Sequence, residues 1–164
     1  MKIRRKKNLV AAAGAVALVA AASPAMAVVL ASTNNLANFT FTTGTPTLLA
    51  TAGFFLNANE SFVVTFSAEC AVDAAAGSTS AWTDIDIQLL NAAGAVVSTL
   101  SPTSGSADAF CTSNGTVGFD GWTTASMTLS SSVAPAGVYS IRVLGRLNFG
   151  TGGWFGERSL VVYR

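Results

Sequence analysis

Residues 62–70 read FVVTFSAEC, and their apolar and polar side chains alternate with a period of two. Phe62, Val64, Phe66, Ala68 and Cys70 share one face of an extended chain. Val63, Thr65, Ser67 and Glu69 share the other face. The pattern predicts a β-strand with one face in a hydrophobic core, and it places Cys70 in that core.

Three further segments, 82–90, 122–130 and 139–147, alternate in the same way. The residues predicted to point inward are Ile85, Ile87 and Leu89, then Ala125, Met127 and Leu129, then Tyr139, Ile141, Val143 and Leu147. Shorter strands are expected at 39–42, 47–51, 54–56, 95–100, 109–112, 116–119 and 159–164. No helical repeat of useful length is present. Eight to ten short strands predict an all-β fold, an antiparallel β-sandwich or jelly roll.

The segments between these strands are typical of turns and loops. Asn91–Gly94 is expected to form a hairpin turn between two strands. Residues 101–108 and the glycine-rich run 150–156, which contains Trp154 and Phe155, are expected to form loops. Residues 28–38 are expected to form a flexible arm.

Residues 1–27 have the three parts of an export signal. A basic start at Lys2–Lys7 precedes an apolar run at 9–22, and Ala25-Met26-Ala27 forms a small-x-small cleavage site. The alternative is a retained membrane anchor, but the apolar run is shorter than the roughly 20 residues that a spanning helix needs. The sequence therefore predicts a periplasmic or extracellular protein with no membrane span after cleavage and one domain at residues 28–164.

The composition of residues 28–164 excludes several classes of function. This part of the chain has four arginines, eight acidic residues, no lysine and no histidine, so its formal charge is about −4. Without grouped basic residues it is unsuited to nucleic acid or to anionic lipid. Without histidine or lysine it lacks the usual catalytic bases and Schiff-base nucleophiles. We therefore expect a non-enzymatic protein without a cofactor.

Asp84 and Asp86 form the one carboxylate pair that could carry chemistry. They lie two residues apart on one strand face, which puts their carboxylates roughly 6–7 Å apart. Three interpretations stay open: a solvated strand face, calcium ligands or a catalytic pair. In the first, Arg142 and Arg146 face the two aspartates from a neighbouring strand. In the second, Asp108 and Asp120 are further weak calcium candidates, although the sequence has no Asp-x-Asp-x-Asp-Gly loop.

Cys70 and Cys111 are the only cysteines. An even number in an exported chain favours one disulfide over free thiols or metal ligands.

The three tryptophans, Trp82, Trp122 and Trp154, are the side chains best suited to contact a ligand. Indole rings stack on sugars, and acidic or amide side chains bind hydroxyl groups, so Trp82 with Asp84 and Asp86, Trp122, and Trp154 with Phe155 are candidate ligand-binding residues. The alternative is that each tryptophan covers an edge of the core.

Several motifs together resemble a group of small bacterial exported domains of unassigned function. They are FSAEC at 66–70, DIDI at 84–87, AFC at 109–111, Trp122 with Ser126, AGVYSIRV at 136–143 and SLVV at 159–162. The resemblance covers roughly residues 54–163 and implies a β-sandwich with a Cys70–Cys111 bridge. It implies no activity.

A weaker resemblance is to chaperone–usher pilins, which are also exported, poor in charge and crosslinked by one disulfide, with a penultimate tyrosine, here Tyr163. It implies that residues 28–31 act as a donor strand. Cys70, however, falls later in the chain than the first pilin cysteine.

The sequence thus predicts a structural or adhesive exported domain that acts by surface contact. The alternatives are a carbohydrate-binding domain and a self-assembling subunit, either trimeric or pilin-like.

Overall fold

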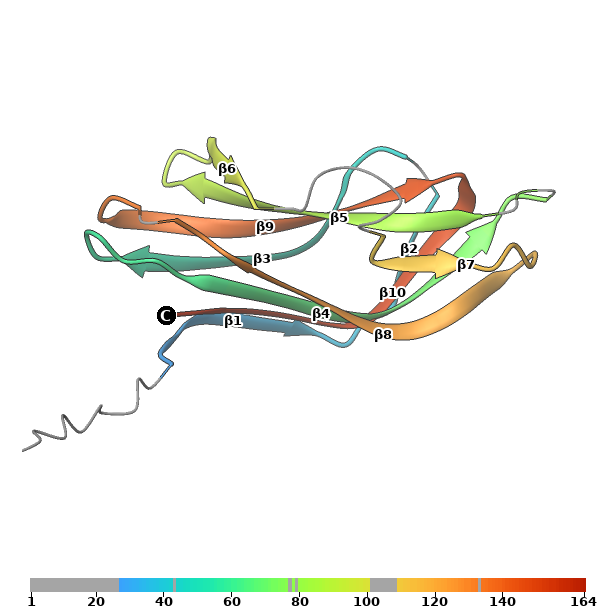
Figure 1. Ribbon diagram of the computed structural model, residues 1–164, viewed down its shortest axis with the longest axis horizontal. Coiled ribbons are helices and arrows are strands. Elements are labelled where there is room, and N and C mark those ends of the chain that lie inside the picture. Colours follow the sequence, from blue (N-terminus) through green and yellow to red (C-terminus); the bar gives the residue numbers. More distant parts are fainter. Residues whose placement is uncertain (1–26, 43, 77, 79, 101–108, 133) are drawn as a thin grey trace, which may run out of the picture.

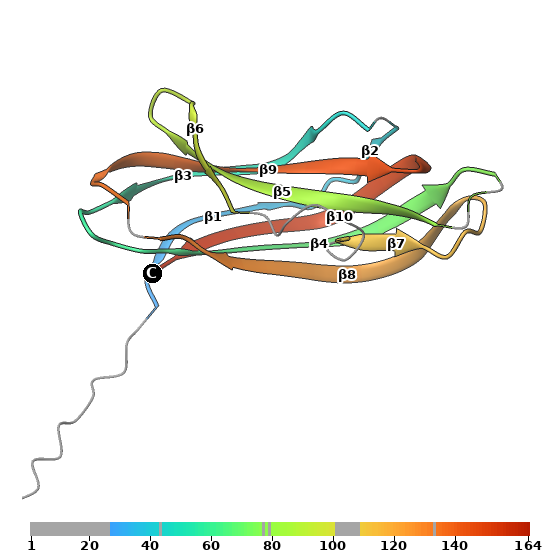
Figure 2. The ribbon, with the colours of Figure 1, turned by 45° about the horizontal axis from the view of Figure 1, so that its top comes forward.

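The computed structural model describes residues 27–42, 44–76, 78, 80–100, 109–132 and 134–164. Within these ranges there are ten strands: β1 Val29–Asn35, β2 Phe39–Phe41, β3 Thr47–Leu56, β4 Val63–Ala74, β5 Ala81–Asn91, β6 Val96–Thr99, β7 Cys111–Ser113, β8 Phe119–Ser130, β9 Gly137–Asn148 and β10 Gly150–Tyr163. They form two five-stranded antiparallel sheets that face each other (Figures 1 and 2). No helix of membrane-spanning length and apolarity occurs in this part of the chain.

The strand order is that of a jelly roll. Sheet A has the order β1-β10-β4-β8, with β2 also on β10, and sheet B has the order β3-β9-β5-β6, with β7 also on β5. The pairs β1–β10, β3–β9, β4–β8 and β5–β6 are nested, as in one long antiparallel ribbon rolled over on itself. The predicted fold class is confirmed.

The core lies between the sheets and is built from the side chains that the alternation placed inward. Phe62, Phe66, Ile87 and Ile141 are almost completely buried. Their burial removes apolar surface from water, and this is the main term that favours folding. Cys70 of β4 and Cys111 of β7 form the predicted disulfide across the core, with a Cα–Cα distance of 6.3 Å.

The prediction of a loop at 150–156 is wrong, because this segment is the first half of β10. Its glycines replace side chains where aromatic rings need the space. A Cβ on Gly153 would lie 2.6 Å from the ring of Phe41. Phe155, expected in an exposed loop, is completely buried and stacks on Phe41 with ring centroids 5.9 Å apart.

The expected flexible arm at 28–38 is also wrong, because it contains β1. This strand pairs with the last part of β10, and the backbones of Val28 and Arg164 exchange hydrogen bonds of 2.7 and 3.0 Å. Leu30 and Ala31 pack against the core from this edge. Residues 28–31, the expected donor strand, therefore lie against β10 of their own chain.

The expected strands at 47–51 and 54–56 are one strand, β3. The expected strand at 116–119 is wrong except for Phe119, because residues 116–118 lie outside any strand and β8 begins at Phe119, three residues before the expected start at 122. The expected hairpin at Asn91–Gly94 is confirmed by hydrogen bonds from Asn91 N to Ala95 O and from Gly94 N to Asn91 O. The predicted export signal, except Ala27, and the expected loop at 101–108 lie outside the described residues, so both stay predictions.

Candidate functional site

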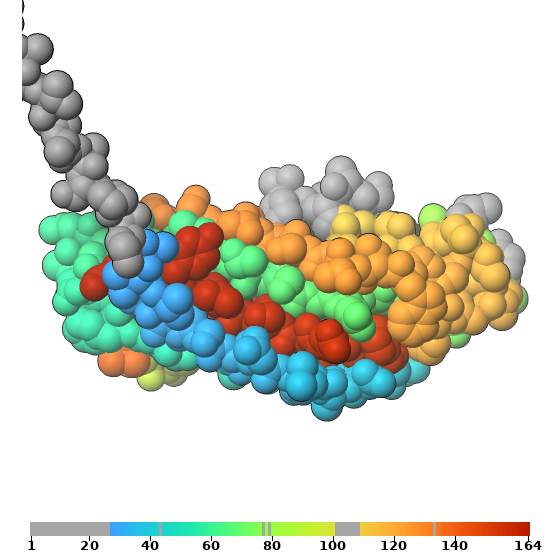
Figure 3. Space-filling view, turned by 90° about the horizontal axis from the view of Figure 1, so that it is seen from below, coloured from blue at the N-terminus to red at the C-terminus, as the bar shows by residue number. Residues whose placement is uncertain are grey.

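Two of the three tryptophans meet on the outer face of sheet A. Trp122 comes from β8 and Trp154 from β10, the strands on either side of β4. Their ring centroids are 4.7 Å apart and their planes are inclined by 63°, an edge-to-face contact. Figure 3 looks onto this face, where β8, β4, β10 and β1 lie side by side. Because Trp122 is 60% exposed, a large part of the pair is open to solvent.

A β-bulge in β8 holds Trp122 in this position. Gly121 and Trp122 together oppose Ala71 of β4, and Gly121 has a φ of 62°, which a glycine adopts without strain. A Cβ on Gly121 would lie 2.0 Å from the carbonyl oxygen of Thr112. Trp122 Nε1 donates a hydrogen bond of 3.1 Å to Phe119 O, which fixes its ring.

Glycines in β10 leave room for the aromatic rings to lie against the strand on the same face. Gly152, Trp154 and Gly156 alternate on the outer face of the strand. A Cβ on Gly156 would lie 2.5 Å from Cη2 of Trp154, so the indole lies across this glycine. A Cβ on Gly152 would lie 3.1 Å from the Phe119 ring in the same way. Phe119, Trp122 and Trp154 therefore share the outer face of sheet A, and we call these three side chains the aromatic surface.

A carboxylate lies beside the aromatic surface. Glu69 is the outward residue of β4 that pairs with Gly156 on one side and with Thr124 on the other. Glu69, Trp122, Thr123 and Thr124 line a shallow pocket of about 270 Å³. Sequence reasoning did not single out Glu69 or Phe119 as site residues, although the alternation of residues 62–70 had put Glu69 on the outer face.

The third tryptophan is elsewhere. Trp82 lies on the outer face of sheet B, where its ring contacts Phe149 with centroids 5.1 Å apart. Phe149 follows β9, has a φ of 56° and is 72% exposed. The three indoles thus do not converge, and Trp82 with Phe149 forms a separate, smaller apolar contact.

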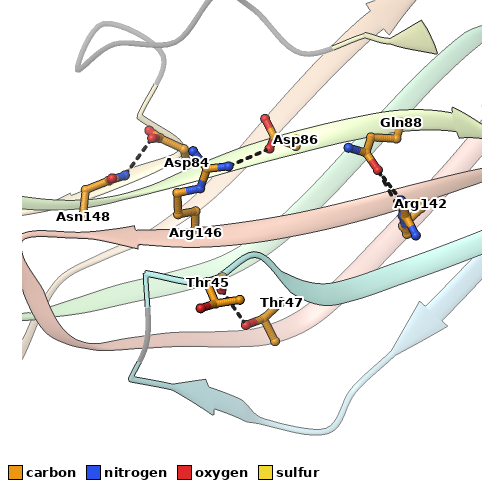
Figure 4. Close-up of polar contacts among 8 residues, drawn as sticks. All are labelled: Thr45, Thr47, Asp84, Asp86, Gln88, Arg142, Arg146 and Asn148. Carbon is orange, nitrogen blue, oxygen red and sulfur yellow. Dashed lines mark hydrogen bonds and ion pairs between the residues drawn. The ribbon is translucent and has the colours of Figure 1, made fainter. Parts of the chain in front are cut away.

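Asp84 and Asp86 also lie on the outer face of sheet B, and strands β5 and β9 are neighbours as expected (Figure 4). Arg146 forms an ion pair with Asp86 at 3.6 Å, and Asn148 Nδ2 donates a hydrogen bond of 2.7 Å to Asp84. Arg142 lies opposite Gln88 and donates from Nε and Nη2 to its amide oxygen at 3.0 and 2.7 Å. The expected four-charge ladder is thus wrong in part, because Arg142 binds an amide and not a carboxylate.

The calcium candidates are not brought together. Asp84 and Asp86 lie on sheet B, whereas Asp120 lies on sheet A, where its carboxylate accepts a hydrogen bond of 3.2 Å from Thr116 N. Asp108 lies outside the described residues. Within the described ranges, no three Asp, Glu, Cys or His side chains are grouped closely enough to hold a metal ion.

Comparisons with known proteins bear on the fold. No protein-family model matches the chain, and no curated protein matches it. Among solved structures, the chain is similar to VP2 of infectious bursal disease virus in its subviral particle, with 15% identity over 92% of this chain and a TM-score of 0.53. It is also similar to the same virus's Gx strain structure, with 15% identity over 92% of this chain and a TM-score of 0.47.

This chain spans little more than a third of the VP2 chain, namely 37%. At this identity the likeness shows a shared β-sandwich fold. The resemblances to bacterial exported domains and to pilins stay predictions.

Proposed function

We propose that this protein is an exported, non-enzymatic domain that acts by surface contact and binds carbohydrate on its aromatic surface. The observation that carries the proposal is the edge-to-face pair of Trp122, which is 60% exposed, and Trp154, which is half-buried. Leaving most of the Trp122 indole in water contributes little to the folding free energy, so its ordered exposure beside Trp154 supports a contact surface.

The chemistry of the surface suits a sugar ring. The flat faces of the two indoles offer apolar area to the C–H groups of a pyranose. Glu69, Thr123 and Thr124 line the adjacent pocket and provide a carboxylate and two hydroxyl groups for sugar hydroxyls. An apolar platform with a few polar groups at its rim is the usual composition of a small-molecule site.

The site is also held in place before any ligand arrives. The bulge at Gly121, the hydrogen bond from Trp122 Nε1 and the packing of Trp154 against Gly156 fix the orientation of both rings. A preformed site loses less conformational entropy on binding than a mobile one. Export is supported by the form of residues 1–27 and by the Cys70–Cys111 disulfide, since disulfides persist in oxidising compartments.

A glycan array probed with the folded protein tests this function. We expect binding to a subset of glycans, and we expect Trp122→Ala and Trp154→Ala to abolish it. Trp82→Ala is the matched control, because it also removes an indole but from the other sheet. Retention of binding in both sheet A variants, or equal loss in Trp82→Ala, would refute the proposal.

Self-assembly is a second candidate, and one surface feature favours it. Phe55 of β3 and Val138 of β9 are register partners on the outer face of sheet B, and they are 56% and 57% exposed. The viral chain with the same fold forms a subviral particle. Analytical ultracentrifugation tests this candidate: we expect an oligomer that dissociates in Phe55→Ser, and a monomer at all concentrations would exclude it.

A further inference from the structure

A second β-bulge, in the middle of β10, turns a charged side chain inward. Gly156 pairs with Glu69 and Ser159 pairs with Ser67, so that Glu157 and Arg158 share the place opposite Ala68. Glu157 has a φ of 43°, which marks the bulge. Beyond it the alternation changes phase, and Arg158 falls on the same face as the buried Leu160. Arg158 is only 5% exposed.

The buried guanidinium of Arg158 has few partners. Nη2 donates a hydrogen bond of 3.2 Å to Ala37 O, and the guanidinium carbon lies 5.2 Å from the centre of the Phe39 ring. Nε is buried and has no acceptor among the described residues, and no described carboxylate lies within ion-pairing distance. Burial lowers the pKa of Arg158. A buried cation without an anion is costly, so this arrangement calls for a negatively charged partner.

Arg158 forms part of the wall of a pocket of about 350 Å³ at the open side of the sandwich, between the edge strands β1 and β3. Phe39, Leu48 and Leu49 give the pocket an apolar wall, and Thr33 and Asn35 give it a polar rim. The register of β3 shifts between Leu48 and Ala50, so a bulge shapes this wall as well. The pocket thus combines one buried positive charge with apolar surface.

We propose that this pocket binds a small organic monocarboxylate, whose carboxylate pairs with Arg158 and whose apolar body lies against Phe39 and Leu48. A single carboxylate matches the single charge and the forked donors of a guanidinium. The volume is near the lower end of ligand sites, about 300–1,000 Å³, and suits a body of one ring.

Arg158 is the one cationic residue among the described residues that line this pocket, so the pocket does not favour a multiply charged anion such as phosphate. The other described arginines are engaged elsewhere: Arg142 with Gln88, Arg146 with Asp86 and Arg164 with Glu60. Residues 28–164 contain no lysine or histidine. This site is separate from the aromatic surface and does not depend on the proposed carbohydrate function.

Arginine Nε–H resonances report directly on this site. The whole chain has six arginines, so that the Nε–H region of a ¹H–¹⁵N spectrum is simple, and Arg158→Lys assigns the Arg158 signal by its loss. We propose a titration of the folded protein with sodium benzoate, with sodium chloride and sodium phosphate at equal ionic strength as reference salts.

We expect the chemical shift of the Arg158 Nε–H signal to change with benzoate concentration and to reach a plateau. In both reference salts we expect no plateau. The melting temperature should rise with benzoate alone, because a ligand that binds only the native state stabilises it. An unsaturated response to benzoate, or an equal response to phosphate, would overturn the proposal.

A second experiment uses a variant that leaves Arg158 intact and blocks the pocket. Leu48→Trp places a bulky ring at the mouth of the pocket and should abolish the saturating shift while the Arg158 signal remains. Val97→Trp, which places the same ring at an exposed position of β6 outside the pocket, should bind benzoate like the unmodified protein. Saturation with unchanged affinity in Leu48→Trp would place the binding outside this pocket and refute the assignment.

Discussion

Trp122 and Trp154 meet edge to face across Ala71, an alanine that faces outward from sheet A and is nevertheless completely buried. The two indoles cover it from the strands on either side. The contact depends on a glycine at each ring: Gly121 sets the bulge that carries Trp122, and Gly156 leaves room for the ring of Trp154. The backbone of sheet A is thus shaped to keep this pair on its surface.

Gly156→Ala is expected to separate the two indoles. The added methyl group would lie 2.5 Å from the ring of Trp154, which must swing away and lose an edge-to-face contact worth about 0.5–1.5 kcal/mol. Circular dichroism should show loss of the exciton signal of the pair, and glycan binding should fall. Gly53→Ala is the control, since this strand glycine has ordinary room for a methyl group. An unchanged exciton signal in Gly156→Ala would contradict the prediction.

Phe155→Ala should destabilise the protein by about 3–5 kcal/mol, because Phe155 is completely buried and packs against Phe41 and Phe110. Trp154→Ala, one residue away on the opposite face of β10, should cost much less. Urea unfolding of the two variants measures the difference. Equal costs would mean that residues 150–156 do not form the core strand described above.

Removal of the disulfide should cost about 4 kcal/mol on the chain-entropy model, since Cys70 and Cys111 are 41 residues apart. The bond links β4 of sheet A to β7 of sheet B. Because both strands are also held by their sheets in the folded state, loss of the bond raises the conformational entropy of the unfolded chain more than that of the folded one. Urea unfolding of Cys70→Ala/Cys111→Ala against the oxidised protein gives the value. A midpoint that does not change on reduction would argue against a structural role for the bond.

Ionised Glu60 should stabilise the folded protein, and this contribution to the free energy of unfolding should be lost in acid. Hydrogen bonding to Arg164, then to the side chain and backbone of Asn57, lowers the pKa of Glu60 from 4.5 to about 2. Because the folded-state pKa is the lower one, this stabilisation is complete above pH 4.5 and is lost as the pH falls through about 2.

The matched variant for this effect is Glu60→Gln, which keeps the shape and removes the titration. Urea midpoints measured between pH 2 and pH 6 should fall less steeply with acid in Glu60→Gln than in the unmodified protein. Parallel curves for the two proteins would contradict the prediction.

Much of the fold could be predicted from the sequence because most strands bury one face. The alternation in residues 62–70 and 139–147 reports which side chains meet the core, and the structure confirms both assignments. The first half of β10 was missed for two reasons. Its glycines have no side chain to show an alternation, and the bulge at Glu157 and Arg158 shifts the phase of the pattern.

The candidate site could be predicted only in part. In residues 122–130 the alternation that turns Ala125, Met127 and Leu129 inward leaves Trp122 on the outer face, where the structure has it. Its contact with Trp154 depends on β8 and β10 both pairing with β4, and no local pattern encodes that pairing. Arg158 carried no signal at all, because an isolated arginine near the end of a chain is ordinarily a surface residue.

The pairing of Val28 with Arg164 determines how the molecule would be presented if it were tethered. Val28 and Arg164 lie together at one end of the β1–β10 pair, while Trp154 lies nine residues before Tyr163, the last residue of β10, roughly 30 Å away at 3.3 Å per residue. A cell wall, a fusion partner or a resin attached next to Val28 or Arg164 would therefore hold the domain at the end that is distant from Trp154. The indole pair would then lie on the side of the domain formed by sheet A, distant from the attachment.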